Sequence, residues 1–269
     1  MNGFRARLGL ARELLREAGA RARRMAGRRA ELAVARKGPQ DFVTALDREI
    51  EALVRGELAR AFPDDAFLGE EEGGRAAGRA WILDPIDGTA NFLRGIPYWS
   101  ITLALVEAGR PVAGWVYDPL HDELFEARAG EGAFRDGTPI RTSAATVPGE
   151  ACIGLSHTFR VPKTAYLALL EGLLDAGFDH RRPGSAALAL AYVADGRLEG
   201  TVFLSANVWD VLGGMLLVRE AGGVTTPFDA FGPEPAPAPV FAAAPAIAPV
   251  LEAVVVRACA AGGLQMTKS

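Results

Sequence analysis

The chain is poor in the residues that build disulfide frameworks and zinc centres. Its 269 residues include only two cysteines, Cys152 and Cys259, and three histidines. Two thiols form neither a disulfide scaffold nor a cysteine-based zinc site, and they fit a reducing cytoplasm. His121, His157 and His180 lie in segments without a partner motif, so we interpret them as bystanders to any chemistry.

Lysine is also scarce, and there is no long apolar run. Three lysines stand against 26 arginines, and the net charge of −4 argues against nucleic-acid binding as the main role. The longest apolar candidate, near residues 236–256, is interrupted by Pro245 and Pro249 and falls short of the roughly 20 residues of a membrane span. With 49% hydrophobic and 23% charged residues, the composition predicts a folded cytoplasmic protein without a membrane or nucleic-acid partner.

The sequence does contain regular helix and strand patterns. Apolar residues at three- and four-residue spacing predict an amphipathic helix over residues 3–33, in preference to an Arg-rich transit peptide, and a second helix over 44–61. Further predicted elements are strands at 67–68, 80–83, 98–106, 111–117, 122–127, 151–156, 200–204 and 240–243, helices at 163–176, 185–194, 208–221 and 247–260, a hairpin corner at 136–137 and a loop at 233–239. We expect an N-terminal α+β lobe at 1–144 and a C-terminal α/β lobe at 145–269.

Two acids follow an apolar run in the segment WILDPIDGTANF, residues 81–92. We expect a strand that ends at Asp84 and a turn at Pro85, which places Asp84 and Asp87 side by side at the strand's carboxyl end. Gly88-Thr89 then leads into a helix, whose first N–H groups favour phosphate. Acids beside a phosphate need a cation between them, and oxygen-only ligands select Mg²⁺. A solvated turn is the alternative that this segment alone leaves open.

Further acids are candidates for the same site. Glu70 comes first after a short apolar strand, whereas Glu71 and Glu72 fit a solvated loop. Asp210 begins a predicted helix, where an acid is either a favourable N-terminal charge or a ligand. Asp47 follows Thr44 at capping-box spacing, and a helix cap and a contact to a metal-bound water are compatible roles.

Five segments together resemble the inositol monophosphatase family. The first is the stretch at 81–92, and the second is Val208-Trp209-Asp210 ahead of Glu220-Ala221-Gly222-Gly223. The others are GPQDFVTALD at 38–47, LGEE at 68–71 and PGSAALALAYVADGRLEG at 183–200. They occur in the family's order and cover nearly the whole chain.

The resemblance implies a layered αβαβα sandwich of the inositol monophosphatase and fructose-1,6-bisphosphatase type, often a homodimer. It implies a hydrolase that cleaves a small phosphate monoester with two to three Mg²⁺ ions, with Mn²⁺ as a substitute and frequent inhibition by Li⁺. The N-terminal lobe would carry most of the metal ligands, and the C-terminal lobe Asp210 and the substrate-recognition residues.

Family roles map onto individual residues of this chain. Glu70, Asp84 and the Ile86 carbonyl would hold one ion, Asp84, Asp87 and Asp210 a second, and Glu70 would also touch a weaker third. Gly88 and Thr89 would bind phosphate, and Thr89 with Asp47 would orient the attacking water. The run Gly184, Ser185 and Ala186 lies in the predicted substrate-binding segment.

The alcohol-recognition part departs from the family pattern. Phe203 stands where inositol-specific members carry a glutamate seven residues before the Trp-Asp aspartate, and Phe cannot accept hydrogen bonds from ring hydroxyls. Arg181 or Arg182 either contacts the leaving group or pairs with surface acids, and Arg36 and Lys37 either approach the phosphate or are solvated. Histidinol phosphate, a nucleotide 3′-phosphate and fructose 1,6-bisphosphate are therefore alternative substrates. A regulatory protein-binding role on the same fold is the alternative from a different class.

Overall fold

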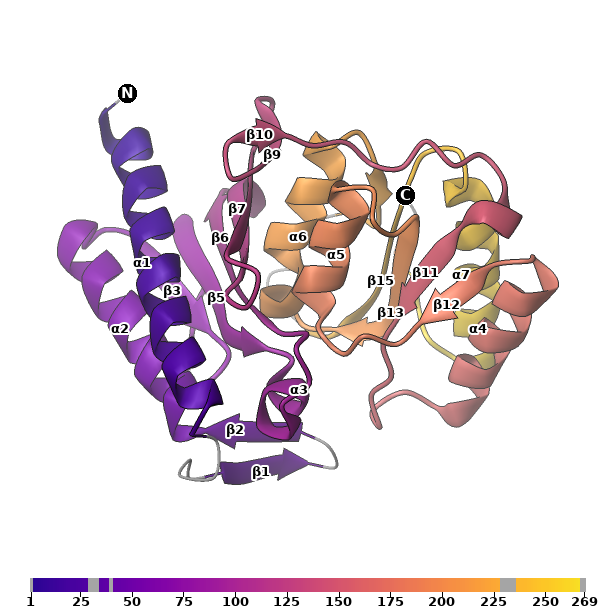
Figure 1. The fold of residues 1–269 in the computed structure, drawn as a ribbon, viewed down its shortest axis with the longest axis horizontal. Coiled ribbons are helices and arrows are strands. Elements are labelled where there is room, and N and C mark those ends of the chain that lie inside the picture. The colour runs from indigo at the N-terminus through magenta and orange to yellow at the C-terminus, as the bar shows by residue number, and fades with distance from the viewer. Residues whose placement is uncertain (1, 29–33, 39–40, 228–235, 267–269) are drawn as a thin grey trace.

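The computed structural model describes residues 2–28, 34–38, 41–227 and 236–266, which form five alternating layers of helices and strands (Figure 1). Helices α1 (Asn2–Ala26) and α2 (Ala45–Ala61) form the first layer. An eight-stranded sheet follows, then α5 (Ala186–Ala194) and α6 (Val208–Glu220), then a five-stranded sheet. Helices α4 (Lys163–Asp175) and α7 (Ala248–Gly262) cover the far side. This arrangement is the predicted αβαβα sandwich.

The larger sheet has the strand order β10-β9-β8-β7-β6-β5-β3-β4. Its strands are β3 (Ala66–Gly69), β4 (Gly73–Gly74), β5 (Arg79–Asp87), β6 (Ser100–Glu107), β7 (Arg110–Asp118), β8 (Glu123–Arg128), β9 (Gly132–Arg135) and β10 (Thr138–Pro139). All neighbours are antiparallel except β3 and β5, which run parallel.

Helices cover both faces of this sheet, which explains why its central strands are apolar without interruption. Trp81 and Leu83 of β5 belong to the core formed with α1 and α2. Ile82, between them, belongs to the core formed with α5 and α6. Each strand therefore contributes alternate residues to two separate cores.

The smaller sheet has the order β12-β11-β13-β15-β14. Its strands are β11 (Cys152–Leu155), β12 (Asp179–Arg181), β13 (Gly200–Ala206), β14 (Val224–Thr225) and β15 (Ala238–Ala243), and a 3₁₀ turn at Pro148–Glu150 precedes them. The strands β12, β11 and β13 are parallel, so the residues that follow β11 and β13 leave the same edge of the sheet. A third core lies between this sheet and helices α4 and α7.

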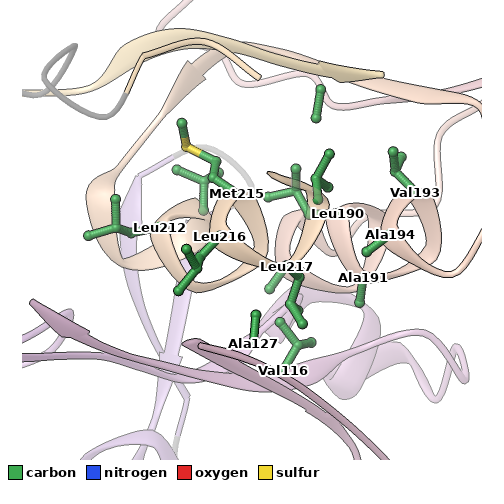
Figure 2. Packing of buried hydrophobic residues seen from close by; sticks show 14 of the residues in the cluster. Val116, Ala127, Leu190, Ala191, Val193, Ala194, Leu212, Met215, Leu216 and Leu217 are labelled. Carbon is green, nitrogen blue, oxygen red and sulfur yellow. The ribbon is translucent and has the colours of Figure 1, made fainter. Parts of the chain in front are cut away.

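Small residues let the middle helix layer lie close to its neighbours. A methyl group on Gly114 of β7 would come within 2.6 Å of the Gly213 carbonyl oxygen of α6, so these two backbones are in direct contact. Figure 2 shows Leu217 of α6 beside Val116 and Ala127 of the larger sheet, all within one buried cluster. The helices α5 and α6 thus belong to the core of both sheets rather than to the second half of the chain alone.

The main departures from the predicted elements are near the N-terminus. Helix α1 ends at Ala26, short of the predicted end at residue 33, and residues 29–33 lie outside the described part of the chain. An antiparallel pair, β1 (Val34–Gly38) and β2 (Asp41–Thr44), precedes α2 and was not predicted. The predicted loop at 233–239 is described only from residue 236.

Most other predicted elements are confirmed to within a few residues. The corner at Asp136-Gly137 joins β9 and β10, and both residues have positive φ, as a tight hairpin turn requires. None of the described helices is long and apolar enough to cross a bilayer.

Candidate active site

An extra residue in β5 puts two aspartates on one face of the sheet. Asp84 pairs with Thr102 of β6 and Asp87 pairs with Ser100, so three steps along β5 match two along β6. Residues three apart on a regular strand point to opposite faces, and one inserted residue cancels that alternation. The prediction that the strand ends at Asp84 in a turn is wrong, because β5 continues as a bulged strand to Asp87. The bulge achieves the juxtaposition that we expected from the turn.

Asp84 is a buried carboxyl group among other acids. Only 3% of the residue is exposed, and its Oδ1 accepts a hydrogen bond of 3.0 Å from the Ile86 N–H. Burial raises the pKa of Asp84 well above its usual range, and the negative charges of Glu70, Asp87 and Asp210 raise it further. The four acids therefore lie close enough to oppose one another's ionisation.

Parallel pairing brings Glu70 to this group. Gly69 at the end of β3 pairs with Leu83, and the next N–H, that of Glu70, donates to the Leu83 carbonyl over 3.2 Å. Glu70 is therefore beside Asp84, where its negative charge raises the pKa of the Asp84 carboxyl group.

Asp87 is held by the N-terminus of α5. It accepts hydrogen bonds from the N–H groups of Ala186 (3.1 Å) and Ala187 (2.8 Å) and from the hydroxyls of Ser185 and Ser100. Burial raises the pKa of Asp87, and these hydrogen bonds, that from Ser185 the largest, oppose the rise. The predicted substrate residues Ser185 and Ala186 thus direct their polar groups to Asp87.

Asp210 lies in the first turn of α6 and has the helix-start role that we considered for it. Its Oδ2 accepts from the backbone N–H (2.9 Å) and the side-chain amide (3.1 Å) of Asn207. Burial raises the pKa of Asp210 well above its usual range, Glu70 and Asp87 raise it further, and the bonds from Asn207 lower it. The cap and the acidic cluster therefore share one carboxylate.

The segment after Asp87 packs tightly against the loop that precedes α5. Gly88 has φ +94°, and a methyl group there would approach the Gly184 carbonyl oxygen to 3.1 Å, so glycine is required on both counts. The short helix α3 (Thr89–Arg94) follows, and the Thr89 hydroxyl donates to the Ile86 carbonyl over 2.9 Å. The side-chain amide of Asn91 joins the two segments, donating to the carbonyls of Tyr98 and Pro183, each over 2.7 Å.

The donor set fits a hard divalent cation by its chemistry. It consists of carboxylates whose burial and mutual repulsion a dication would relieve, with no nitrogen or sulfur ligand among them. In the part of the chain that the structure describes, no three His, Cys, Asp or Glu side chains are already arranged to hold a metal ion. The oxygens of Asp87 are already occupied by hydrogen bonds from α5 and its N-cap residue.

Other residues singled out from the sequence lie as follows. Asp47 accepts from the Thr44 backbone N–H over 2.8 Å and completes the predicted capping box of α2. Arg181 is exposed and pairs with Asp179 at 2.7 Å, which is the surface-acid alternative that we considered. Phe203 is only 2% exposed, within the core around α5 and α6. The side chains of Arg36 and Lys37 lie outside the described residues.

Two polar residues at the site were missed by sequence reasoning. Ser100 donates to Asp87, and Glu51 of α2 accepts from the backbone of the loop that follows Glu70. Glu51 had a usable signal, because it lies four residues after Asp47 on the side of α2 that also carries Val54 and Leu58. A carboxylate on a buried helix face needs partners, which makes it a candidate for a specific role.

Comparisons with known proteins give one consistent family for this chain. A sequence profile of the inositol monophosphatase family matches residues 6–258. An inositol-1-monophosphatase of Rhizobium meliloti is 42% identical over 200 residues, covering 72% of this chain and 75% of that protein. The Nus factor SuhB of Xylella fastidiosa is also 42% identical over 200 residues, covering 73% of each chain.

A solved structure gives the same result for the fold. The crystal structure of the extragenic suppressor protein SuhB from Bartonella henselae superimposes with a TM-score of 0.87 at 35% identity, covering 93% of this chain and 98% of that one. The match leaves little of either chain out. By sequence profile, relatives and fold, this chain belongs to the inositol monophosphatase family.

Proposed function

We propose that this protein hydrolyses the phosphate monoester of a small alcohol in a Mg²⁺-dependent reaction. The observation that carries the proposal is the convergence of Glu70, Asp84, Asp87 and Asp210, four carboxyl groups from three separate segments whose charges raise the pKa of Asp84 and Asp210. Membership of the inositol monophosphatase family supports phosphatase chemistry at this place.

The proposed ligands are the four carboxylates and the Ile86 carbonyl. When bound, Mg²⁺ would supply charge for the developing negative oxygens and make hydroxide more available near neutral pH. We assign two to three ions to the site, with Mn²⁺ as a substitute. The N–H groups that hold Asp87 fix the direction of its carboxylate, and the cap on Asn207 does the same for Asp210.

Thr89 is the proposed water-orienting residue, together with Asp47. The Thr89 hydroxyl donates a hydrogen bond to the Ile86 carbonyl. Its oxygen can therefore accept a hydrogen bond from a water. In the hydrolysis, the water oxygen bonds to phosphorus while the bond from phosphorus to the alcohol oxygen breaks. The products are phosphate and the alcohol, which receives a proton from the solvent. The roles of Gly88 and Thr89 in binding phosphate, and of Gly184, stay predictions.

The experiment measures phosphate release from a generic monoester at a series of Mg²⁺ concentrations, with EDTA as the baseline. We expect Mg²⁺-dependent turnover that falls by at least about 100-fold in Asp84→Asn. Glu72→Gln, an exposed acid from the neighbouring loop, is the matched control and should turn over like the parent chain. Equal activity in EDTA and Mg²⁺, or full activity in Asp84→Asn, would refute the proposal.

The substrate's alcohol is the next question, and Phe203 bears on it. Phe203 is buried, and its side chain has no polar group that could accept a hydrogen bond from an inositol ring. A panel of inositol 1-phosphate, histidinol phosphate, fructose 1,6-bisphosphate and adenosine 3′,5′-bisphosphate would rank the options by kcat/KM. We expect inositol 1-phosphate not to be strongly preferred, and a preference above about 100-fold would contradict this expectation.

A regulatory role is the second candidate, since the Xylella fastidiosa relative carries the name Nus factor SuhB. The two functions can share one fold, so we propose it as an addition to catalysis. Copurification with the transcription machinery from the native host, unaffected by Asp84→Asn, would support it. The homodimer and the cytoplasmic location also stay predictions. Sedimentation would test the homodimer, and cell fractionation would test the location.

A further inference from the structure

Glu51 is a fully buried carboxylate outside the acidic cluster, with 0% of the residue exposed. It lies in the middle of α2, on the face that packs against the larger sheet. A buried charge is costly unless it is fully paired, so its partners show what it does.

Two of the three described partners of Glu51 lie in the loop after β3, and the third, Arg55, lies on α2 itself. Its carboxylate accepts from the Glu71 N–H over 2.8 Å, from the Glu72 N–H over 3.0 Å and from the Arg55 guanidinium over 2.6 Å. The same nitrogen of Arg55 also donates to the Gly73 carbonyl over 2.9 Å. The Glu51 carboxylate and the Arg55 guanidinium thus hold Glu71, Glu72 and Gly73, the last two residues of the loop and the first of β4.

Glu70 lies between this attachment and the sheet. Its own N–H is bound to the Leu83 carbonyl, and the two N–H groups that follow are bound to Glu51. The backbone of Glu70 is therefore fixed on both sides, and with it the starting point of its side chain. The pairing of β4 with β3 closes the far end of this loop, and Glu51 holds the N–H groups inside it.

The fit leaves no free space between the helix and the loop. A methyl group on Gly69 would lie 2.2 Å from the Glu51 carboxyl carbon, which no real contact allows. Arg55 is fixed in turn, since its guanidinium lies over the Phe67 ring at 4.3 Å from the centroid. The position of Glu51 is set by packing as well as by hydrogen bonds.

We infer that Glu51 is a positioning residue that sets the Glu70 carboxylate for binding the divalent cation, acting through the N–H groups of Glu71 and Glu72. The inference rests on the proposed function of the site. Because the charge of Glu51 is already shared with two N–H donors and Arg55, it can position Glu70 without joining the repulsion among the cluster acids. A glutamine at this place keeps the shape but meets at least one N–H donor with its own NH₂ group.

The test measures Mn²⁺ binding, which does not depend on turnover, by the loss of the free Mn²⁺ signal in electron paramagnetic resonance. We expect Glu51→Gln to raise the dissociation constant for Mn²⁺ by about tenfold or more, because mutation of residues that orient metal ligands commonly weakens metal binding by this much. Amide exchange at Glu71 and Glu72 should speed up in the same variant. Glu57→Gln, a half-buried acid of the same helix that pairs with Arg60, is the matched control and should bind Mn²⁺ normally.

Arg55→Met serves as a second variant, because it removes the cation that holds the Glu51 carboxylate and the Gly73 carbonyl while it keeps the two N–H donors to Glu51. We expect a shift of Mn²⁺ affinity in the same direction, and this variant decides the question if Glu51→Gln does not fold. Unchanged Mn²⁺ affinity in a folded Glu51→Gln protein, or in Arg55→Met when only that variant folds, would overturn the inference. Failure of the parent chain itself to bind Mn²⁺ would instead refute the proposed function, so the two failures are distinguishable.

Discussion

Neutralising Asp84 should stabilise the metal-free protein while it abolishes catalysis. The Asp84→Asn change keeps the shape and the Oδ1 atom that accepts from Ile86. It removes one charge from a cluster in which burial, Glu70, Asp87 and Asp210 all raise the pKa of Asp84. Two unit charges about 5 Å apart repel by about 3 kcal/mol at an effective dielectric near 20. Because proton uptake already relieves part of this, we expect a gain of about 1–3 kcal/mol in the free energy of unfolding.

The gain should depend on pH in a definite direction. Since folding raises the pKa of Asp84 above its unfolded value of about 3.9, the folded metal-free protein binds more protons than the unfolded chain. The contribution of this group to stability is full below the unfolded pKa and is lost as the pH rises through the folded pKa. The advantage of Asp84→Asn should therefore be absent near pH 3.5 and largest above the folded pKa.

Urea denaturation in EDTA, followed by circular dichroism at several pH values, measures this difference. Adding Mg²⁺ should reverse the order, since the ion binds and stabilises the parent chain more than the variant. Glu72→Gln is again the control and should change little at any pH. A variant that is equally stable or less stable than the parent chain in EDTA at neutral pH would refute the account of an electrostatically strained cluster.

The remaining predictions concern packing at two glycines and a charge introduced into the core. Gly214→Ala should lower the free energy of unfolding by about 1–3 kcal/mol in urea denaturation, because its methyl group would lie 2.6 Å from the Leu190 Cβ. Gly9→Ala, in α1 with nothing within 4 Å, should raise it by about 0.5–1 kcal/mol, and equal effects at both glycines would contradict this. Phe203→Glu, which introduces the residue that the resemblance assigns to inositol-specific members, should destabilise by about 3 kcal/mol or more without improving inositol 1-phosphate turnover, because it buries an unpaired charge. Faster turnover of inositol 1-phosphate by the folded fraction of this variant would contradict the prediction.

The helices and strands and their order were predictable because their signals are local, in the alternation of helical and strand patterns. The layered arrangement was predicted from the resemblance of the five motif segments to the family. The strand pair β1 and β2 was missed because Thr44 carries a strong helix-start signal that directed attention to α2. The run Phe42-Val43-Thr44 favours a strand but is too short to predict one by itself. Helix α1 is shorter than predicted because the periodic apolar residues end at Met25, and Gly27 follows.

The acidic cluster was predictable only in its membership. Sequence spacing named Glu70, Asp84, Asp87 and Asp210, but their partners depend on contacts between distant segments. The hydrogen bonds from α5 to Asp87 join residues about a hundred positions apart in the chain, which no local pattern encodes. The bulge in β5 is equally invisible, since the Pro85 that marks it is as typical of a turn as of an irregular strand. Assigning roles to Ser185 and Glu51 required the folded arrangement.

The backbone contact between α6 and the larger sheet has a consequence for how this site could change. Gly213 lies one helical turn beyond Asp210, and a methyl group there would meet the Leu103 carbonyl oxygen at 3.0 Å. Because this contact is already tight, a larger residue would press the start of the helix away from the strands and shift Asp210 with it. If Asp210 binds a divalent ion as proposed, natural variation at this glycine would tune the affinity for that ion while leaving every acidic residue untouched.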